Sequence, residues 1–393
     1  MKKLFMVLPF VSVLCFTFSC QKQEQVERFM EDGVEVVVNH LEPYKLKGEP
    51  SNLILEKVLT IDTEKDEIAE IGLTDIGAFD VDSEGNIYLV SPHANENFIF
   101  KFDRDGNYIH SFCRMGQGPG EMSYAPQGIN INSQNEITVT ETTAKKLLIF
   151  NNNGNLLDET PITIEDDDWG QGIQIGSVIP LENGNYFCFK FIFLDSGDYL
   201  FHNIVGIHDS DFKRIKDLDE YKIPNYSRGK KTQGILSFCF SITGDKIYIG
   251  NDNRGYEIWV FDLDGNLQRK IRKEYEKIPI PKEFIEESLK TLPEQMRKMM
   301  TFPEVFHPIQ SLFTDEMGRL YVMTYEKGED SGEYIFDIFN ADGIFIGRKS
   351  LRAFNGSFNL GSLGVVGKQN LLYSTIEKDS GFKELVVYKM TWE

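Results

Sequence analysis

The chain has 393 residues, enough for two or three ordinary domains or for one large domain built from repeats. Its formal net charge is −20, which disfavours nucleic acid and anionic lipid as partners because both need a cationic surface. Aromatic residues make up 12% of the chain, and their side chains fit the pleated, half-buried surface of a sheet. We therefore expect a β-rich protein.

The first 19 residues have the pattern of an export signal. Two lysines precede an apolar segment at residues 4–16, which is too short to span a bilayer as a helix. Ser19 followed by Cys20 resembles the cleavage site of bacterial lipoproteins, in which the cysteine becomes the lipidated first residue. Loss of residues 1–19 leaves 39 Lys and Arg against 61 Asp and Glu, a net charge of −22. An ordinary secretory signal cleaved nearby is the alternative.

The next segment separates this signal from the folded part of the chain. Residues 20–50 are polar and rich in Gln and Glu, so we predict a tether that joins Cys20 to a domain at residues 51–393.

That domain repeats a unit of four short strands separated by two kinds of turn. The best copy, at residues 78–90 and 98–108, reads strand, Gly-Asn turn, strand, gap, strand, Asp-x-Asp-Gly-Asn turn, strand. The first kind of turn recurs at residues 134–137, 183–186, 244–248, 317–321 and 368–373, and the second at residues 151–155, 209–212, 262–266 and 340–344. Four short strands make a propeller blade, so the repeats predict an all-β, six-bladed β-propeller.

Two segments complete this architecture. The sixth unit lacks its second turn, and we expect Leu53 to Thr60 to supply its outer strand and to close the ring without exposed edges. Residues 281–300, between blades four and five, have a proline near a helix start, early acids and helically spaced apolar residues. We predict a short helical insertion there, either a packed covering of the ring or a functional lid.

The cysteines and histidines point away from metal chemistry. Cys113, Cys188 and Cys239 each stand beside phenylalanine, which favours buried, small apolar side chains over disulfides. The six histidines are scattered, and only His307, beside Pro308 on a connector, merits a test. The Asp-x-Asp-Gly-Asn turns lack the longer loop ending in Glu that calcium needs, so we expect them to act as turns. We predict no metal and no cofactor.

The GQGPGE segment at residues 116–121 allows three interpretations. A dinucleotide-binding loop would need a helix after it, but Pro119 and the next strand pattern exclude one. An anion site made by glycine N–H groups is possible. We favour a structural connector in which glycines allow positive φ, Pro119 stiffens the crossing and Glu121 anchors a nearby amide or Arg.

The paired turns, this GQGPGE segment and the Pro-rich segment at residues 302–308 together resemble a family of bacterial lipoproteins. These are six-bladed β-propellers related to NHL-repeat and TolB-like propellers, abundant in Bacteroidota-type bacteria. The resemblance covers about residues 50–393, with departures at Thr17 in the lipidation site and at Asn135-Glu136, which replaces Gly-Asn. It implies an envelope location and a binding or scaffold role, without an agreed catalytic set.

The candidate site lies on the connectors between blades. Connectors from one blade's outer strand to the next inner strand cross one face of a propeller, and loops on a rigid scaffold usually carry the site. Aromatic platforms edged by polar groups suit sugars or peptides, whereas the alternative is a solvated rim with an incidental Trp. The predicted ligand-binding residues are Arg114, Glu121, Asp168, Trp169, Tyr226, Arg228 and His307.

These observations favour a lipid-anchored envelope protein, in the outer membrane, with the side that it faces left open. We expect it to bind a glycan, a peptide or an envelope partner protein, without catalysis and without nucleic acid. The alternative is a metal-dependent propeller hydrolase or lyase, similar to lactonases or NHL-type lyases. A third possibility is a scaffold that docks through residues 281–300.

Overall fold

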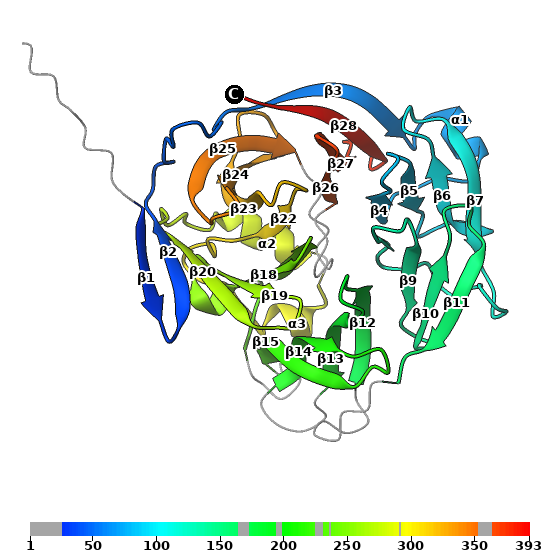
Figure 1. Cartoon of the computed structure of the whole chain (residues 1–393), viewed down its shortest axis with the longest axis horizontal. Coiled ribbons are helices and arrows are strands. Elements are labelled where there is room, and N and C mark those ends of the chain that lie inside the picture. The colour runs from blue at the N-terminus through cyan, green and yellow to red at the C-terminus, as the bar shows by residue number, and fades with distance from the viewer. Residues whose placement is uncertain are drawn as a thin grey trace, which may run out of the picture.

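The computed structural model describes residues 26–163, 173–193, 199–224, 231–235, 237–290, 292–352 and 364–393. Its strands form six blades around a central axis, so the predicted six-bladed β-propeller is confirmed (Figure 1). Five blades have four strands and one has six. In blades one to five the four repeat strands run in chain order from the inner to the outer position, each antiparallel to the next, whereas blade six takes its outer strand from the N-terminal part of the chain.

Blades one to three are β4 (Ala78–Val81), β5 (Ile87–Val90), β6 (Asn97–Phe102) and β7 (Tyr108–Arg114); β8 (Asn130–Ile131), β9 (Ile137–Glu141), β10 (Lys146–Phe150) and β11 (Leu156–Pro161); and β12 (Ile173–Pro180), β13 (Tyr186–Phe193), β14 (Tyr199–His208) and β15 (Arg214–Pro224). Blades four to six contain β17 (Phe238–Thr243), β18 (Lys246–Asn251), β19 (Glu257–Asp262) and β20 (Leu267–Lys273); β22 (Ser311–Thr314), β23 (Leu320–Lys327), β24 (Glu333–Phe339) and β25 (Phe345–Arg352); and β26 (Val365–Lys368), β27 (Leu371–Glu377), β28 (Lys383–Trp392) and β3 (Leu53–Asp62). A short helix, α1 (Asp66–Glu70), follows β3.

The repeated turns are held by their first side chain. Asp103 accepts hydrogen bonds through Oδ1 from the backbone N–H groups of Asp105 and Asn107, at 3.0 and 2.8 Å. Gly106 in the same turn has a φ of 84°, a conformation that glycine adopts without strain. The same pair of hydrogen bonds recurs at Asp82, Asn132, Asn151, Asp209, Asp262, Asp315 and Asn340. These side chains therefore serve as turn formers, as the sequence predicts.

The ring closes at blade six. Strand β3 pairs antiparallel with β28 from Asp62 to Leu53, so the predicted closing strand is confirmed. Near the axis, Asp80 of blade one accepts hydrogen bonds from the Lys368 ammonium of blade six, at 2.7 Å, and from the Ile131 N–H of blade two, at 2.8 Å. One buried carboxylate therefore links three neighbouring blades where the first meets the last.

The residues before β3 correct one prediction. Strands β1 (Glu27–Glu31) and β2 (Val34–Asn39) form a hairpin, and β2 pairs parallel with β20, which extends blade four to six strands. Asn39 is fully buried; its side chain donates to the Arg272 and Gly343 carbonyls and accepts from the Phe345 N–H. The predicted tether is therefore wrong for residues 27–39, because a valine-rich strand there finds an open sheet edge.

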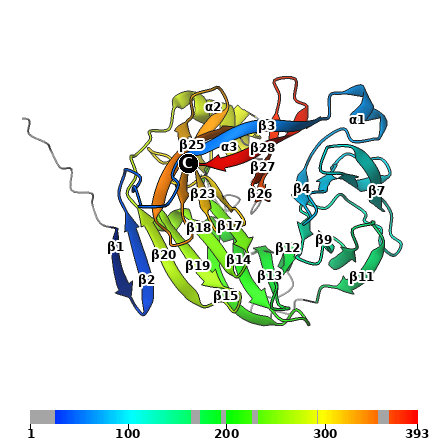
Figure 2. The same ribbon diagram turned by 45° about the horizontal axis from the view of Figure 1, so that its top comes forward.

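The predicted helical insertion between blades four and five is confirmed. It contains α2 (Lys282–Lys290) and α3 (Glu294–Arg297), which lie outside the sheets (Figure 2). The short strands β16 (Thr232–Gln233) and β21 (Met300–Thr301) pair in parallel and join this insertion to the connector before blade four. The described part of the chain contains no helix that is both long and apolar enough to cross a membrane.

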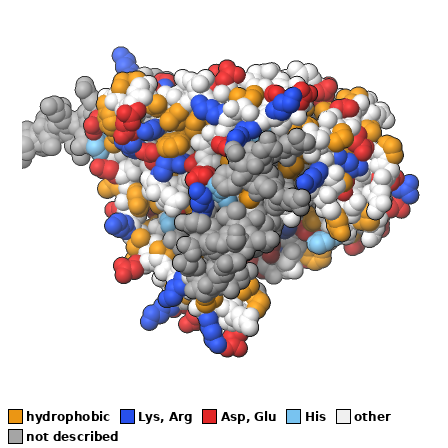
Figure 3. All heavy atoms as spheres, turned by 90° about the horizontal axis from the view of Figure 1, so that it is seen from below, with side chains coloured by type: hydrophobic (Ala, Val, Ile, Leu, Met, Phe, Trp, Pro, Cys, Tyr) orange, Lys and Arg blue, Asp and Glu red, His pale blue; other side chains and the backbone are white. Residues whose placement is uncertain are grey.

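The described cysteines are buried, as their phenylalanine neighbours predict. Cys113, Cys188 and Cys239 are free and buried, and burial raises the pKa of each thiol to about 12. The visible surface in Figure 3 carries acidic and basic side chains interspersed, so on this side the excess of acids is spread rather than gathered.

Candidate functional site

The structure separates the predicted site residues. Arg114 ends the outer strand of blade one, Glu121 follows on the connector to blade two, and His307 lies on the connector between blades four and five. No described contact joins His307 to either of the other two. The remaining predicted residues lie outside the described part of the chain: Cys20, Asp168, Trp169, Tyr226 and Arg228.

The GQGPGE connector is occupied by the protein's own carboxylates. The Gly118 N–H donates to Glu121 Oε2 at 2.9 Å, and the Gly120 N–H donates to Glu159 Oε2 at 2.8 Å. A Cβ atom on Gly116 would lie 2.0 Å from Glu121 Oε2, so this position accommodates the folded-back carboxylate only as glycine. The loop has the geometry of an anion site, but Glu121 and Glu159 take the place of the anion.

A lysine completes this connector. The Lys146 ammonium donates to the Glu121 carbonyl at 2.8 Å and to Glu159 Oε1 at 3.2 Å, and lies 3.7 Å from Glu141 Oε2. Glu141 in turn accepts the Ser123 N–H at 3.0 Å. Hydrogen bonding to Gly120, with a further contribution from Lys146, lowers the pKa of Glu159. The connector between blades one and two is therefore a closed polar network, as the structural interpretation predicts.

His307 contacts a buried carboxylate on blade four. Its Nε2 lies 3.4 Å from Oδ2 of Asp252, which belongs to a 3-10 turn after β18, η3 (Asp252–Arg254). The same carboxylate accepts the Ser237 N–H at 3.0 Å and the Tyr221 hydroxyl at 3.3 Å. Burial raises the pKa of Asp252. These contacts tie together groups from blades three and four and the connector to blade five.

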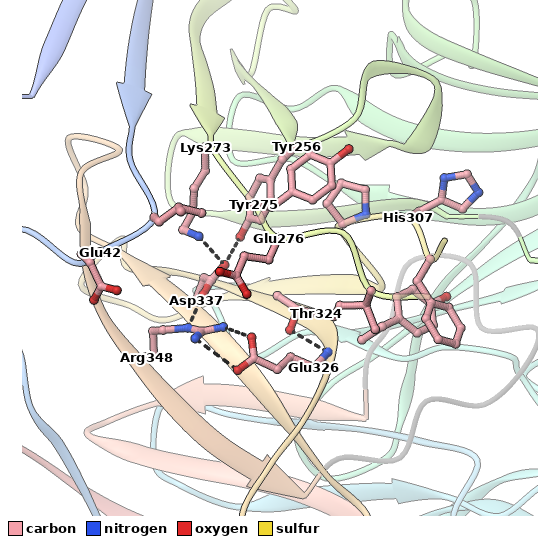
Figure 4. A pocket seen from close by; sticks show the side chains of 15 residues that line it. Glu42, Tyr256, Lys273, Tyr275, Glu276, His307, Thr324, Glu326, Asp337 and Arg348 are labelled. Atoms are coloured by element: carbon pink, nitrogen blue, oxygen red, sulfur yellow. Dashed lines mark hydrogen bonds and ion pairs between the residues drawn. The ribbon is translucent and has the colours of Figure 1, made fainter. Parts of the chain in front are cut away.

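A cleft of about 220 Å³ opens beside His307, between blades four and five (Figure 4). Blade four contributes Tyr256 and Lys273, and blade five contributes Asp337 and Arg348. The cleft lies on the connector side, where a propeller site is expected, but displaced from the central axis.

A buried carboxylate organises the floor of the cleft. Asp337 accepts the Tyr256 hydroxyl at 2.7 Å and Arg348 Nε at 2.9 Å, and the Lys273 ammonium lies at 3.4 Å. Arg348 also pairs with Glu326. Burial lowers the pKa of Lys273 and raises that of Tyr256. The floor therefore presents fixed donors and acceptors whose charges largely cancel.

Aromatic rings form the walls. Phe306 stacks on Tyr325 with ring centroids 4.2 Å apart, and Phe284 of α2 meets Phe306 edge-on at 5.0 Å. Tyr275, at the mouth, is 37% exposed, and its ring lies 6.2 Å from that of Tyr256. Rings beside oriented polar groups can pack against an apolar face of a ligand while hydrogen bonds fix its edge.

The sequence missed most of this cleft. Tyr256, Lys273, Asp337 and Arg348 lie in strands or at strand ends, whereas connectors alone were considered as candidates. One signal was present, because Asp337 interrupts the apolar strand from Tyr334 to Phe339, and a charge in a buried strand needs partners.

Two further observations bear on ligands. Within the described ranges, no group of three or more His, Cys, Asp or Glu side chains is placed to hold a metal ion. A second cavity, of about 310 Å³, follows the innermost strands of all six blades. It contains Asp80 and Lys368, which are already paired with each other.

Comparisons with known proteins agree on the fold. Residues 74–242 match a family described as 6-bladed beta-propeller (DUF5128), and no curated protein matches the sequence. A crystal structure named "Putative exported protein" from Bacteroides fragilis is 14% identical with a TM-score of 0.51, over 91% of this chain and 99% of that one. A member of the DUF4221 family from Bacteroides vulgatus is 13% identical with a TM-score of 0.51, over 88% and 100%. At such identities these similarities show the fold alone, and that fold is the six-bladed β-propeller.

Proposed function

We propose that this protein is an envelope lipoprotein, anchored to the outer membrane through lipidated Cys20, which binds an extracellular glycan or peptide without catalysis. The observation that carries the binding role is the cleft between blades four and five, with its aromatic walls and polar floor. The export signal of the sequence and a similar fold in a protein named as exported support the envelope location.

The size and chemistry of the cleft favour a single sugar ring or one peptide side chain. Its volume of about 220 Å³ is below the roughly 300–1,000 Å³ of sites for drug-sized ligands. Tyr275 offers an exposed ring on which a C–H face can pack, and Glu42 and Glu276 at the rim can accept hydroxyl or amide hydrogens. A longer glycan or peptide would continue over the connector face.

The floor supports binding rather than catalysis. A general base needs a carboxylate or imidazole free to take a proton from the substrate. Asp337 instead accepts hydrogen bonds through both oxygens, from Tyr256 and Arg348, with Lys273 beside it. These groups position one another, so a bound ligand would meet a rigid hydrogen-bonding surface.

Binding to immobilised glycans and peptides, compared between two tyrosine variants, tests this proposal. We expect Tyr275→Ala to weaken binding about fivefold, because stacking on an aromatic ring contributes on the order of 1 kcal/mol. Tyr124→Ala is the matched control, since Tyr124 is an exposed aromatic, at 67%, on the connector between blades one and two. Equal binding by wild type and Tyr275→Ala would remove the cleft from consideration, and a loss in Trp169→Ala alone would move the site to the connector after blade two.

Two measurements test the rest of the proposal. Mass spectrometry of the membrane-extracted protein should find acyl chains on Cys20, and Cys20→Ala should be released from the membrane. Metal analysis of residues 21–393 should find no stoichiometric Zn or Ca, whereas a bound ion would favour the metal-dependent hydrolase or lyase. Loss of a co-purified protein on deletion of residues 281–300 would favour the scaffold role.

A further inference from the structure

The N-terminal hairpin lies at the outer rim of blade four. In Figure 1, β1 and β2 stand outside β20, on the side of the ring opposite β7 and β11 of blades one and two. Strand β1 is the outermost strand of this six-stranded sheet. The N-terminal segment therefore enters the propeller at one point of its circumference.

The hairpin is fixed rigidly to the blade. The Glu31 carboxylate pairs with Lys270 at 2.8 Å and with Arg272 at 2.6 Å, and Glu35 pairs with Arg269 at 2.6 Å. The backbone pairing of β2 with β20 runs over five residue pairs, from Glu35 to Asn39. The hairpin consequently moves with the ring.

The chain between the anchor and this hairpin is short. Six residues, 21–26, separate Cys20 from the start of β1 at Glu27. A chain spans at most about 3.3–3.6 Å per residue, so these residues reach about 20 Å. A tether through residue 50 would instead reach about 100 Å and would leave the orientation of the ring free.

The free edge of β1 suits a membrane surface. Phe29 and Met30 are 40% and 66% exposed at adjacent positions, so their side chains flank this edge on the two faces of the sheet. An edge strand that carries exposed apolar side chains is prone to pairing with other chains, unless something covers it. Glu27 and Asp32 beside them are exposed and acidic, which favours zwitterionic headgroups over anionic ones.

We propose that β1 is a membrane-contact surface, so that the propeller stands on the outer rim of blade four, with Phe29 and Met30 against zwitterionic lipid headgroups. This inference rests on the lipidation of Cys20 proposed above. In this orientation the rims of blades one and two point away from the bilayer. The connector face, with the cleft between blades four and five, is turned to the side and is open to large ligands.

Depth-dependent fluorescence quenching tests this orientation. The full lipidated protein carries a fluorophore at Met30→Cys or, as the control, at Leu157→Cys, which is 51% exposed on β11. The native cysteines are buried with pKa values of about 12, so they stay unreactive at neutral pH and need no replacement. The vesicles are phosphatidylcholine with nitroxide-labelled headgroups.

We expect the label at position 30 to be quenched several-fold more strongly than the label at position 157. Insertion of about 20 Gly and Ser residues between residues 25 and 26 should make the two positions alike, because the longer linker frees the ring. Equal quenching without the insertion, in protein whose Cys20 lipidation is confirmed by mass, would overturn this orientation and leave the proposed function intact. An unlipidated Cys20 would overturn both this orientation and the proposed lipid anchoring. A dimer of residues 21–393 with a shielded position 30 would also overturn it, because β1 would then face a second copy.

Discussion

Two connectors do the same structural task in different ways. One joins the outer strand of blade one to the inner strand of blade two, and the other joins blade four to blade five. The first is short, and Glu121, Glu159 and Lys146 occupy its free N–H and carbonyl groups. The second carries two helices and leaves a cleft of about 220 Å³ beside it. The glycine-rich connector is therefore the closed one, whose polar groups bond to each other. The open connector, which borders the cleft, is instead recognised by charged residues within the flanking strands.

The difference shows where a ligand can form new hydrogen bonds. In the first connector the polar groups are consumed locally, so the loop has little left to offer a ligand. In the second, the polar groups come from the sides of two blades, and they line a space rather than fill it. We expect substitutions in the two regions to differ in the size of their effect on stability and in whether that effect is global or local.

Removal of the Asp337 carboxylate should have the largest effect. Asp337→Ala leaves the buried Lys273 ammonium without its ion-pair partner, and loss of one member of a buried ion pair costs about 3–5 kcal/mol. Urea unfolding should show this loss in the free energy of unfolding. Asp342→Ala, at an exposed turn of the same blade, is the control and should change it little. A loss for Asp337→Ala as small as that of the control would mean that the floor of the cleft is not held by this carboxylate.

Addition of one methyl group to the closed connector should have the next largest effect. Gly116→Ala places a Cβ where Glu121 Oε2 lies and forces that carboxylate away from the Gly118 N–H. We expect a loss of about 1.5 kcal/mol, the lower end of the range for a hydrogen bond to a charged group, because the flexible Glu121 side chain can move aside. In a Glu121→Ala background the same change should be nearly neutral, and a double-mutant cycle measures this difference. Additive effects of the two changes would show that Glu121 does not hold the loop.

The ring could be predicted from the sequence because its signals are local. Each hairpin needs a turn that tolerates positive φ, and residues such as Gly85 and Gly106 mark those turns regardless of what packs around them. The spacing of the two turns then predicts a four-stranded blade, and the number of repeats predicts a ring of six blades. The GQGPGE segment could be recognised as a structural connector in the same way, because the sequence after it has no helix pattern.

The cleft could not be predicted because its parts are far apart in sequence and depend on which strand face meets the next blade. Asp337 and Arg348 approach Lys273 and Tyr256 only after blades four and five pack together. The hairpin at residues 27–39 was missed for a similar reason. It lies outside the repeat, and its partner β20 follows more than 200 residues later.

Glu159 should give the closed connector a moderate pH dependence. Its pKa lies below the ordinary value of 4.5, so near that pH the folded state binds fewer protons than the unfolded state. This contribution is complete above pH 4.5 and is lost as the pH falls through the lowered pKa. Glu159→Gln should therefore be less stable than wild type by about 1 kcal/mol at neutral pH, and urea unfolding should show this difference shrinking as the pH falls below 4.5 and through the lowered pKa of Glu159. A difference that persists in acid would assign the effect to packing instead of charge.

The smallest effect is expected where the open connector is held least firmly, at α2. None of its nine residues is buried, and its described ring contact is the edge-on approach of Phe284 to Phe306. Phe284→Ala should speed amide hydrogen exchange within residues 282–290 about fivefold, which corresponds to about 1 kcal/mol of local stability, and leave the global unfolding midpoint unchanged.

Hydrogen exchange at residues 114–122 in the same variant is the internal reference, because hydrogen bonds to its own carboxylates hold that connector independently of α2. Faster exchange confined to α2 would make the helix a separately opening cover of the cleft, which favours the lid over the packed decoration. Unchanged exchange in α2 would mean that contacts other than Phe284 hold it. The insertion would then be a fixed wall, and ligand access would depend on the rim around Tyr275 alone.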